Sequence, residues 1–276
     1  MSPSLSHRLA QLFAAMPQVG AVALGGSMAS GLSDETSDLD LYVFTNGEIP
    51  LSERQALVNA AGGASRADLG LNYWGPGDQW FDAQSGVEVD VVYFDCLWFE
   101  GQLRLLLEQH QPSAGYTTCL WHIGRTLRSL HDPQGWLGWV QQFCQQPYPE
   151  PLRRAIIDHN QPLLATIIPA WRQQLKKALE RHDLVSLNHR LAALLASYFD
   201  ILFALNRHTH PGEKRLLSHV HHHCPLRPEG MVEDLQLLLA QTGSGQPELL
   251  ATLDRVLARL DQLLVSQGIV RVDSQS

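Results

Sequence analysis

The sequence predicts two domains: an α/β (α+β) N-terminal domain built on a mixed sheet, and an all-α helical bundle after it. Short apolar or alternating segments, which are typical of strands, gather in the first part of the chain. Longer segments with helical spacing dominate the second half. Between them, Pro147-Tyr-Pro-Glu-Pro151 places three prolines in five residues, which interrupts regular structure. We therefore expect one domain over residues 1–148 and another over residues 149–276.

The expected elements of the first domain alternate between helices and strands. Apolar residues recur at helical spacing over Leu5–Met16 and again over Ser52–Ala61, where Ser52 is the expected N-cap. A short helix is also expected at Ala29–Ser33. The expected strands are Val19–Leu24, Leu41–Phe44, Leu69–Trp74 and Val87–Phe94, with a hairpin arm at Asp78–Ser85. Elements in this order fit a small mixed sheet.

The rest of the chain is expected to be helical. The helices that complete the first domain are Leu97–Gln109, Thr117–Leu130 and Trp136–Gln145. Those expected in the second domain are Leu152–Thr166, Ile167–Arg181, His182–Asn206, Met231–Ala240 and Glu248–Gln267. The helix over residues 182–206 is apolar on nearly all sides, which indicates that it is buried within a bundle.

The segment after the first expected strand has the composition of a phosphate-binding and metal-binding turn. Gly25, Gly26 and Ser27 follow the strand directly, and glycine lets the backbone approach a phosphate closely. Asp38 and Asp40 then stand two residues apart at the start of the next strand, where their side chains point to the same face. Close carboxylates repel each other unless a cation is bound between them, and such hard oxygen ligands suit Mg²⁺.

A third carboxylate, Asp90, lies in the middle of the Val87–Phe94 strand among apolar residues. A carboxylate in such surroundings needs a metal, a cation or a proton. If this strand pairs beside the one that follows Asp40, then Asp90 joins Asp38 and Asp40 in one site. Three acids can hold two metal ions, which would clamp the attacking and leaving oxygens of a phosphoryl transfer.

These residues resemble the signature of the DNA polymerase β-type nucleotidyltransferase superfamily. That signature is a Gly-Ser pair, a spacer, an Asp-x-Asp pair and a later carboxylate on a strand. Here Gly26-Ser27, Asp38-Leu39-Asp40 and Asp90 match it in order and in spacing. The resemblance is closest to small bacterial members with a helical second domain, such as the aminoglycoside and lincosamide nucleotidyltransferases.

A narrower likeness covers most of the chain. Three segments, Gly115–Trp121, Leu130–Gly135 and Leu205–Arg215, look like those of the nucleotidyltransferase-domain proteins labelled DUF4037. This likeness names no substrate.

The superfamily resemblance implies roles for the site residues. Asp38 and Asp40 would bind Mg²⁺, and Asp90 would complete the metal site or act as general base. Gly26 with Ser27 would hold the β- and γ-phosphates of a nucleoside triphosphate. The expected enzyme is a nucleotidyltransferase of the EC 2.7.7 type. It would move a nucleoside monophosphate, with AMP from ATP as the first choice, onto a hydroxyl of a small molecule or a protein and release pyrophosphate.

Two other local sequences suggest binding. Lys214 and Arg215 follow the long apolar helix and could reach a triphosphate or the leaving pyrophosphate, although a solvated basic loop is the alternative. His219 to Cys224 contains four histidines and a cysteine, which are zinc ligands in other proteins. However, adjacent histidines cannot all face one metal, and no second ligand cluster is evident. A zinc site is therefore not expected there.

Composition limits the partners. The 276 residues carry 20 basic and 28 acidic side chains and a net charge of −8, which argues against a non-specific nucleic-acid binder. A tRNA- or DNA-directed transferase is a less favoured alternative, which would need a local basic cleft. No G-x-G-x-x-G follows the first strand, and Gly26 to Gly31 is not followed by Lys-Ser/Thr. Neither a dinucleotide fingerprint nor a P-loop is therefore present. The alternative to an enzyme is a non-catalytic nucleotide-binding module, similar to an antitoxin, that binds another protein.

The expected location is the cytoplasm. The N-terminal residues lack the apolar core of a signal peptide, and no apolar run approaches the length of a membrane span. Four cysteines are scattered without paired spacing, which is typical of reduced thiols.

Overall fold

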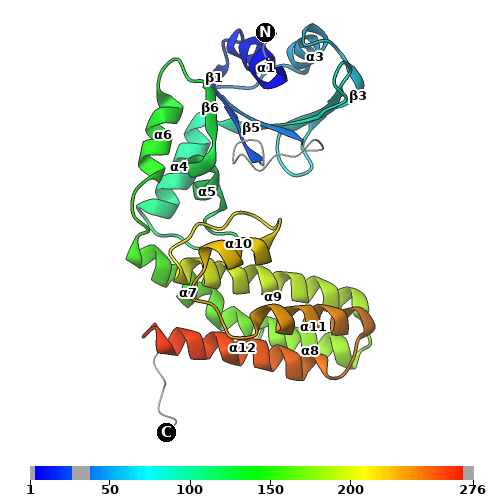
Figure 1. Cartoon of the computed structure of the whole chain (residues 1–276), viewed down its shortest axis with the longest axis vertical. Coiled ribbons are helices and arrows are strands. Elements are labelled where there is room, and N and C mark those ends of the chain that lie inside the picture. The colour runs from blue at the N-terminus through cyan, green and yellow to red at the C-terminus, as the bar shows by residue number, and fades with distance from the viewer. Residues whose placement is uncertain (1–3, 27–37, 270–276) are drawn as a thin grey trace. The chain divides into compact units, whose positions relative to one another are not determined.

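The computed structural model describes residues 4–26 and 38–269, and the chain divides into two compact units. Unit 1 comprises Met1–Arg104 and Leu120–Gln146, and unit 2 comprises Leu105–Cys119 and Pro147–Ser276. Unit 1 contains the sheet and unit 2 is helical, so the predicted fold class is confirmed (Figure 1). Residues 105–119, which the sequence analysis placed in the first domain, cluster with the helices of unit 2.

Unit 1 is built on a six-stranded sheet in the order β3-β4-β5-β2-β1-β6. The strands are β1 (Val19–Leu24), β2 (Leu39–Thr45), β3 (Ala64–Leu71), β4 (Gly77–Asp82), β5 (Glu88–Asp95) and β6 (Arg128–His131). Strands β2 and β5 are parallel, and the other neighbouring pairs are antiparallel, so the sheet is mixed as predicted. The parallel pair lies in the middle of the sheet and carries Asp40 and Asp90.

Helices α1 (Leu5–Ala14) and α3 (Leu51–Ala60) pack on one face of the sheet (Figure 1). The hydrophobic core between the two helices and the sheet is made by alternate strand residues together with apolar side chains of α1 and α3. Its members include Leu9, Phe13, Leu39, Leu41, Val43, Leu57, Trp80, Val89 and Val91. Because alternate residues of a strand point to opposite faces, this packing directs Asp40 and Asp90 to the other face.

Aromatic side chains close one end of that other face. Phe44 of β2 and Phe94 of β5 contact Phe99 of α4 (Cys96–Leu107), with ring centroids 5.1 and 5.3 Å away. Phe44 also contacts Trp136 of α6 (Trp136–Cys144), with centroids 5.0 Å apart. The two central strands therefore run from a polar end to an aromatic end that the helices cover.

Three local predictions for unit 1 were wrong. The helix expected over Thr117–Leu130 is the shorter α5 (Cys119–Thr126). Strand β6 follows it and pairs with β1 on the side away from β2. Strand β6 has only four residues, which is too short to give a periodic signal. Strand β3 begins earlier than predicted and has a register shift beside Gly70. Helix α3 has Pro50 as its N-cap, so Ser52 lies inside the helix.

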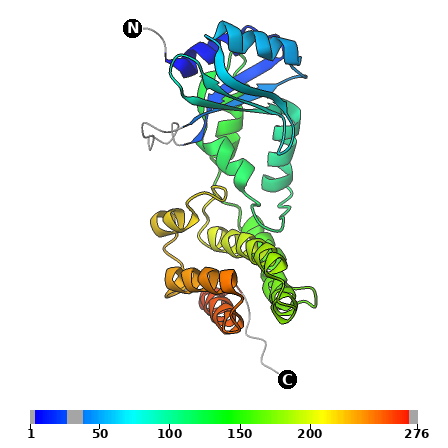
Figure 2. The same ribbon diagram turned by 90° about the vertical axis from the view of Figure 1, so that its right-hand side faces the viewer.

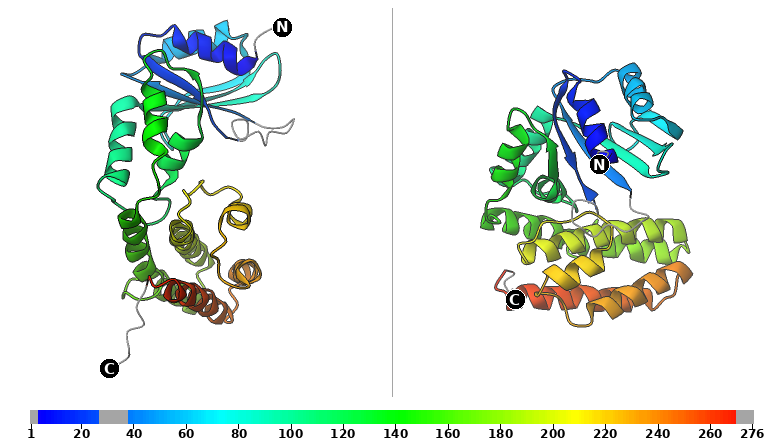
Figure 3. Two further views of the ribbon diagram at one scale, coloured as in Figure 1. Left: turned by 60° about the vertical axis from the view of Figure 1, so that its left-hand side comes forward. Right: turned by 45° about the horizontal axis from the view of Figure 1, so that its top comes forward.

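Unit 2 is a helical bundle, as predicted (Figures 2 and 3). Its helices are α7 (Glu150–Leu164), α8 (Trp171–Glu180), α9 (Leu184–Leu205), α10 (Leu216–His223), α11 (Met231–Ser244) and α12 (Leu249–Ser266). Helix α9 packs against α7, α8 and α11, and α12 packs against α8 and α11. Helix α10 was not predicted. Across the described ranges, no helix combines the length and the apolar character needed to cross a membrane.

A buried carboxylate joins α3 to the sheet. Asp78 of β4 is 2% exposed and accepts hydrogen bonds from Arg54 Nη1 at 2.9 Å, the Gly70 N–H at 2.7 Å and the Tyr93 hydroxyl at 2.7 Å. Burial and the neighbouring charge of Asp78 raise the pKa of Tyr93, so its hydroxyl remains a donor. These contacts connect α3, β3, β4 and β5 on the core face.

We predict that Asp78→Ala lowers the free energy of unfolding by about 3–5 kcal/mol, because it removes the buried carboxylate that pairs with Arg54, whose side chain is 12% exposed. Urea unfolding followed by circular dichroism measures this change. Asp68→Ala is the matched control, since the Arg66–Asp68 ion pair on β3 is exposed at both side chains and should contribute less than about 1 kcal/mol. Equal losses in the two variants would contradict the assigned role of Asp78.

Candidate functional site

The pairing of β2 with β5 places the two predicted strand carboxylates side by side. Asp40 is the register partner of Asp90 in the parallel ladder. Neighbouring strands lie about 5 Å apart, and paired residues point to the same face. Asp90 is also paired with Gln79 of β4, and the N–H of Gly25, just after β1, donates to the Asp40 carbonyl at 2.9 Å. Gln79, Asp90, Asp40 and Gly25 thus form a row across four strands.

Both carboxylates are half-buried, as the apolar surroundings of Asp90 predicted. Their neighbours Leu39, Leu41 and Val89 point into the core on the opposite face and are at most 2% exposed. The register is therefore fixed by apolar packing, because a slip by one residue would turn the core residues toward solvent. The conditional prediction that the two strands pair is confirmed.

The two glycines after β1 lie against this site. A Cβ atom on Gly25 would come within 2.3 Å of Tyr42 Cε2, so no larger residue fits there. Gly26 has a φ of +61°, and a Cβ atom on it would lie 1.8 Å from Asp40 Oδ2. Glycine at both positions lets the backbone approach Asp40 and Tyr42 directly.

Tyr42 is a site residue that the sequence analysis missed. It stands two residues after Asp40 on the same face of β2, and its ring stacks on Phe94 with centroids 6.1 Å apart. Burial, and then the negative charges of Asp40 and Asp90, raise the pKa of Tyr42 to about 12. The tyrosine therefore reports a negative electrostatic field at this end of the sheet.

The carboxylate pair fits a hard divalent cation. Asp40 and Asp90 offer oxygen donors from adjacent strands, and Gly26, which has no side chain, lies directly against Asp40 Oδ2. Such a donor set suits Mg²⁺. Asp38 precedes β2 and is exposed. Among the described residues, it does not join Asp40 and Asp90 in a group of three ligand atoms at metal-binding spacing.

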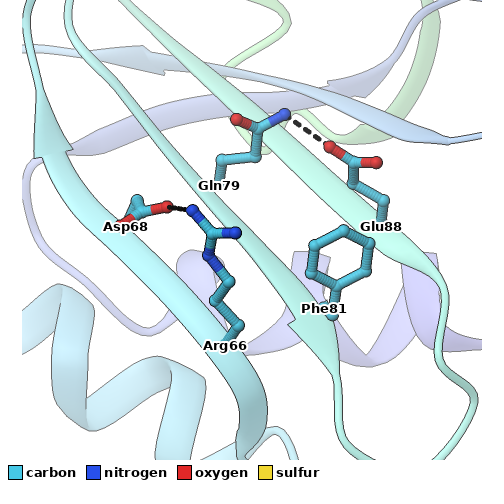
Figure 4. A pocket seen from close by; sticks show the side chains of 5 residues that line it. All are labelled: Arg66, Asp68, Gln79, Phe81 and Glu88. Carbon is cyan, nitrogen blue, oxygen red and sulfur yellow. Dashed lines mark hydrogen bonds and ion pairs between the residues drawn. The ribbon is translucent and has the colours of Figure 1, made fainter.

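A shallow pocket lies beside Asp90 on the same face of the sheet (Figure 4). Its lining residues come from β3, β4 and β5 and are Arg66, Asp68, Gln79, Phe81 and Glu88. Gln79 Nε2 donates to Glu88 Oε1 at 2.6 Å, and Arg66 pairs with Asp68 at 3.2 Å. Since Gln79 is the register partner of Asp90, the pocket adjoins the carboxylate pair.

The other predicted site residues are not all in this unit. Ser27 and the expected helix at Ala29–Ser33 lie outside the described residues. Lys214 and Arg215 belong to unit 2, where both are exposed and Arg215 is the N-cap of α10 with a φ of 55°. Their role toward a triphosphate stays a prediction.

Comparison with known proteins identifies the unit that holds this site. Residues 5–111 match the family described as the nucleotidyltransferase domain. The chain carries a nucleotidyltransferase domain. The matched range contains β2 and β5, and with them Asp40 and Asp90. The nucleotidyltransferase domain indicates nucleotidyl transfer in general, and the predicted superfamily resemblance is confirmed at this level. The narrower likenesses, to DUF4037 and to the antibiotic-modifying enzymes, stay predictions.

The chain is also similar to solved structures, and one of them illustrates the level of identity. This structure is a nucleotidyltransferase-like protein from Exiguobacterium sibiricum 255-15, with 14% sequence identity and a TM-score of 0.42. The similarity covers 93% of this chain and 72% of that one. Comparison with curated proteins gave no match.

Two of the segments that carried the narrower likeness meet in unit 2. The hydroxyl of Thr118 accepts a hydrogen bond from the His210 N–H at 2.7 Å, and the rings of Tyr116 and His210 lie 4.9 Å apart. Cys119 Sγ lies 3.6 Å from His210 Nδ1. Tyr116 has a φ of 58°, which is rare for a non-glycine residue and marks a backbone that its surroundings hold in place.

A buried carboxylate anchors the same turn. Asp200, in the middle of α9, is 1% exposed and accepts hydrogen bonds from the Thr117 hydroxyl at 2.5 Å and the Thr117 N–H at 3.1 Å. Asn160 of α7 donates to it at 3.3 Å and accepts from the Gly115 N–H at 3.1 Å. Burial raises the pKa of Asp200 to about 7, against the opposing effect of the Thr117 hydrogen bonds. A lone acid inside a long apolar helix was the sequence signal for this residue.

We predict that Asp200 makes stability fall as pH rises. In the folded protein the pKa of Asp200 is about 7, above the ordinary value of 3.8. The protonated carboxyl group therefore adds its full contribution to the free energy of unfolding below pH 3.8, and this contribution is lost as the pH rises through about 7. In Asp200→Asn, the Thr117 hydroxyl can turn to the Ser113 carbonyl at 3.2 Å. Between about pH 5 and pH 7, wild type should lose about 2 kcal/mol of unfolding free energy relative to this variant.

Urea unfolding across this pH range measures the difference. Asp158→Asn, at an exposed position of α7, is the control and should keep the wild-type pH dependence. Parallel pH profiles for wild type and Asp200→Asn would rule out a titration of Asp200 in this range.

Proposed function

We propose that this protein is a Mg²⁺-dependent nucleotidyltransferase that moves a nucleoside monophosphate onto a hydroxyl group and releases pyrophosphate. AMP from ATP is the transfer to test first. The register pairing of Asp40 with Asp90 supports this proposal most directly, because it brings two hard oxygen donors together beside a glycine turn. The match of residues 5–111 to the nucleotidyltransferase domain is consistent with it.

Asp40 and Asp90 would hold the metal, with Asp38 approaching from the start of β2. Bound Mg²⁺ would neutralise charge on the triphosphate and favour displacement at the α-phosphorus. The backbone at Gly25 and Gly26 would lie against the phosphates, since neither residue carries a side chain that keeps them away. Tyr42, on the same face of β2 as Asp40, would add a hydroxyl donor to the site.

The transfer forms one bond and breaks one. The acceptor oxygen would bond to the α-phosphorus as the bond to the pyrophosphate oxygen breaks, and the hydroxyl proton must pass to a base. Asp90 is the carboxylate next to the pocket, through its pairing with Gln79. It is therefore the residue we assign to receive that proton or to orient the hydroxyl through the metal site.

The pocket beside Asp90 supports a small polar acceptor. Asp68 and Glu88 supply two carboxylates, Arg66 supplies one guanidinium, and Phe81 adds an apolar surface that is 36% exposed. This lining favours a molecule with hydroxyl groups and a positive charge over an anionic one. A protein acceptor would need to present a side-chain hydroxyl in the same place.

We expect Asp40→Asn and Asp90→Asn each to reduce pyrophosphate release at least about 100-fold. Mutating a residue that only hydrogen-bonds to a metal ligand typically lowers metal affinity or activity 10–100-fold, so mutating a ligand itself should have a larger effect. Release is measured with ATP, GTP, CTP and UTP, a metabolite pool and Mg²⁺, and EDTA should abolish it. Asp158→Asn is the matched control and should leave the rate unchanged, while thermal unfolding checks that each variant is folded.

Each outcome of this experiment is decisive. Retained release in both carboxylate variants would overturn the assigned site. Nucleotide binding without release, across small-molecule and protein acceptors, would favour the non-catalytic interaction module. If the label from nucleotide appears on a protein band, the acceptor is a polypeptide and not a small molecule.

For the acceptor subsite, we predict that Glu88→Gln raises the KM for a cationic acceptor roughly fivefold, because a partly exposed charge contributes up to about 1 kcal/mol. The KM for nucleotide should not change. The substituted amide can still accept the hydrogen bond from Gln79, so the strand contact is preserved. Glu53→Gln, on α3 at the opposite face, is the matched control. A parallel rise in both KM values would contradict the assignment.

A further inference from the structure

Three histidines that are separated in sequence come together in unit 2. His219 and His223 lie on α10, and His208 lies in the segment between α9 and α10. One ring nitrogen of each lies within 4.8 Å of the others. The rings of His208 and His223 stack with centroids 4.6 Å apart and an angle of 5°, and those of His219 and His223 lie 5.9 Å apart.

The helix presents two of these side chains to the same side. Positions i and i+4 of a helix lie on one face, one turn apart, which is a spacing at which two histidines can share a metal ion. Val220 and Cys224, one residue further along in each case, are fully buried and hold α10 against the bundle. His219 and His223 consequently stand at the edge of the buried face of α10.

The third histidine is positioned by the end of α9. The His208 N–H donates to the Phe203 carbonyl at 3.0 Å. Asn206, the C-cap of α9, accepts from the Leu226 N–H at 2.9 Å and donates to the Leu226 carbonyl at 2.7 Å. Since Leu226 follows α10 closely, these hydrogen bonds join the end of α9, next to His208, to the end of α10, next to His223.

One ring nitrogen of the cluster is buried without a partner. Nδ1 of His219 is buried and has no hydrogen-bond partner among the described residues, and a buried polar atom of this kind requires an explanation. Burial, followed by the nearby His223, His222 and Arg215, lowers the pKa of His219. A metal ion would satisfy Nδ1 and hold the neighbouring rings together.

We propose that His208, His219 and His223 form a binding site for a divalent transition metal, with Zn²⁺ as the first candidate. Three imidazole nitrogens with an open fourth position suit zinc and do not suit Mg²⁺, which prefers oxygen ligands. Zn–N bonds of about 2.1 Å place donor atoms on the order of 3.4 Å apart in a tetrahedron, so modest ring rotations would close the site.

This site differs from the one considered in the sequence. The consecutive residues from His219 to Cys224 do not form one ligand set, because Cys224 is buried and His222 Nδ1 lies 2.7 Å from the Ser218 carbonyl. The missing ligand is His208, eleven residues before His219. A bound ion would tie the connection between α9 and α10 to α10 itself, and so fix the segment that contains Lys214 and Arg215.

The test uses the full chain without a histidine tag, freed of metal and then titrated with Zn²⁺ in excess Mg²⁺, which occupies oxygen sites. We expect one Zn²⁺ per chain. His208→Ala, His219→Ala and His223→Ala should each weaken binding at least about 100-fold, because losing a ligand should exceed the 10–100-fold effect of outer partners. His221→Ala, exposed on the same helix, is the matched control and should bind as wild type does.

Two further measurements keep the result independent of catalysis and of folding. Co²⁺ in place of Zn²⁺ should give visible absorption bands that His223→Ala loses and His221→Ala keeps. Added Zn²⁺ should raise the thermal midpoint of wild type and leave that of His219→Ala unchanged. Absence of binding in folded wild type, or equal binding in the three variants, would overturn the site. Neither result would bear on Asp40 and Asp90.

Discussion

The parallel pairing of β2 with β5 is the constraint on which the candidate active site depends. On one face of these strands, Leu39, Leu41, Val89 and Val91 are buried under α1 and α3. Because side chains alternate, this burial forces the intervening Asp40 and Asp90 onto the opposite face, in register. A hydrophobic core on one side of the sheet therefore positions a carboxylate pair on the other.

The same face changes character along its length. Phe44 and Phe94 pack under α4 and α6 at one end, whereas Asp40 and Asp90 lie at the other, with Tyr42 between them. At the aromatic end, Phe44 and Phe99 are fully buried. At the polar end, two glycines allow the backbone after β1 to reach the carboxylates, and the pocket on β3, β4 and β5 extends the polar surface away from them.

Unit 2 uses its longest helix as a scaffold for polar groups. Within α9, Asp200 holds the turn at Thr117, where Tyr116 has a strained backbone. Just beyond the end of α9, the chain brings His208 to the histidines of α10. Asp200 and His208 each lie where two separate segments of the chain meet. Such groups determine how the segments are arranged, because apolar packing alone has no directional preference.

The sequence by itself determined the fold class and most of the elements. Alternation and apolar runs identified β1, β2 and β5, and helical spacing identified α7, α8, α9, α11 and α12, because these signals repeat over several turns or residues. Asp40, Asp90 and the two glycines could also be identified, since glycine turns and carboxylates on strands are unusual enough to be recognised locally.

Only the tertiary structure decided which residues meet. The β2–β5 pairing, the pairing of β6 with β1, and the position of Gln79 beside Asp90 depend on partners far away in the chain. The histidine cluster shows the same limit: the sequence pointed to consecutive residues 219–224, whereas the structure groups His219 and His223 with His208. Local patterns record the preferences of one segment, while a site requires the packing that brings several segments together.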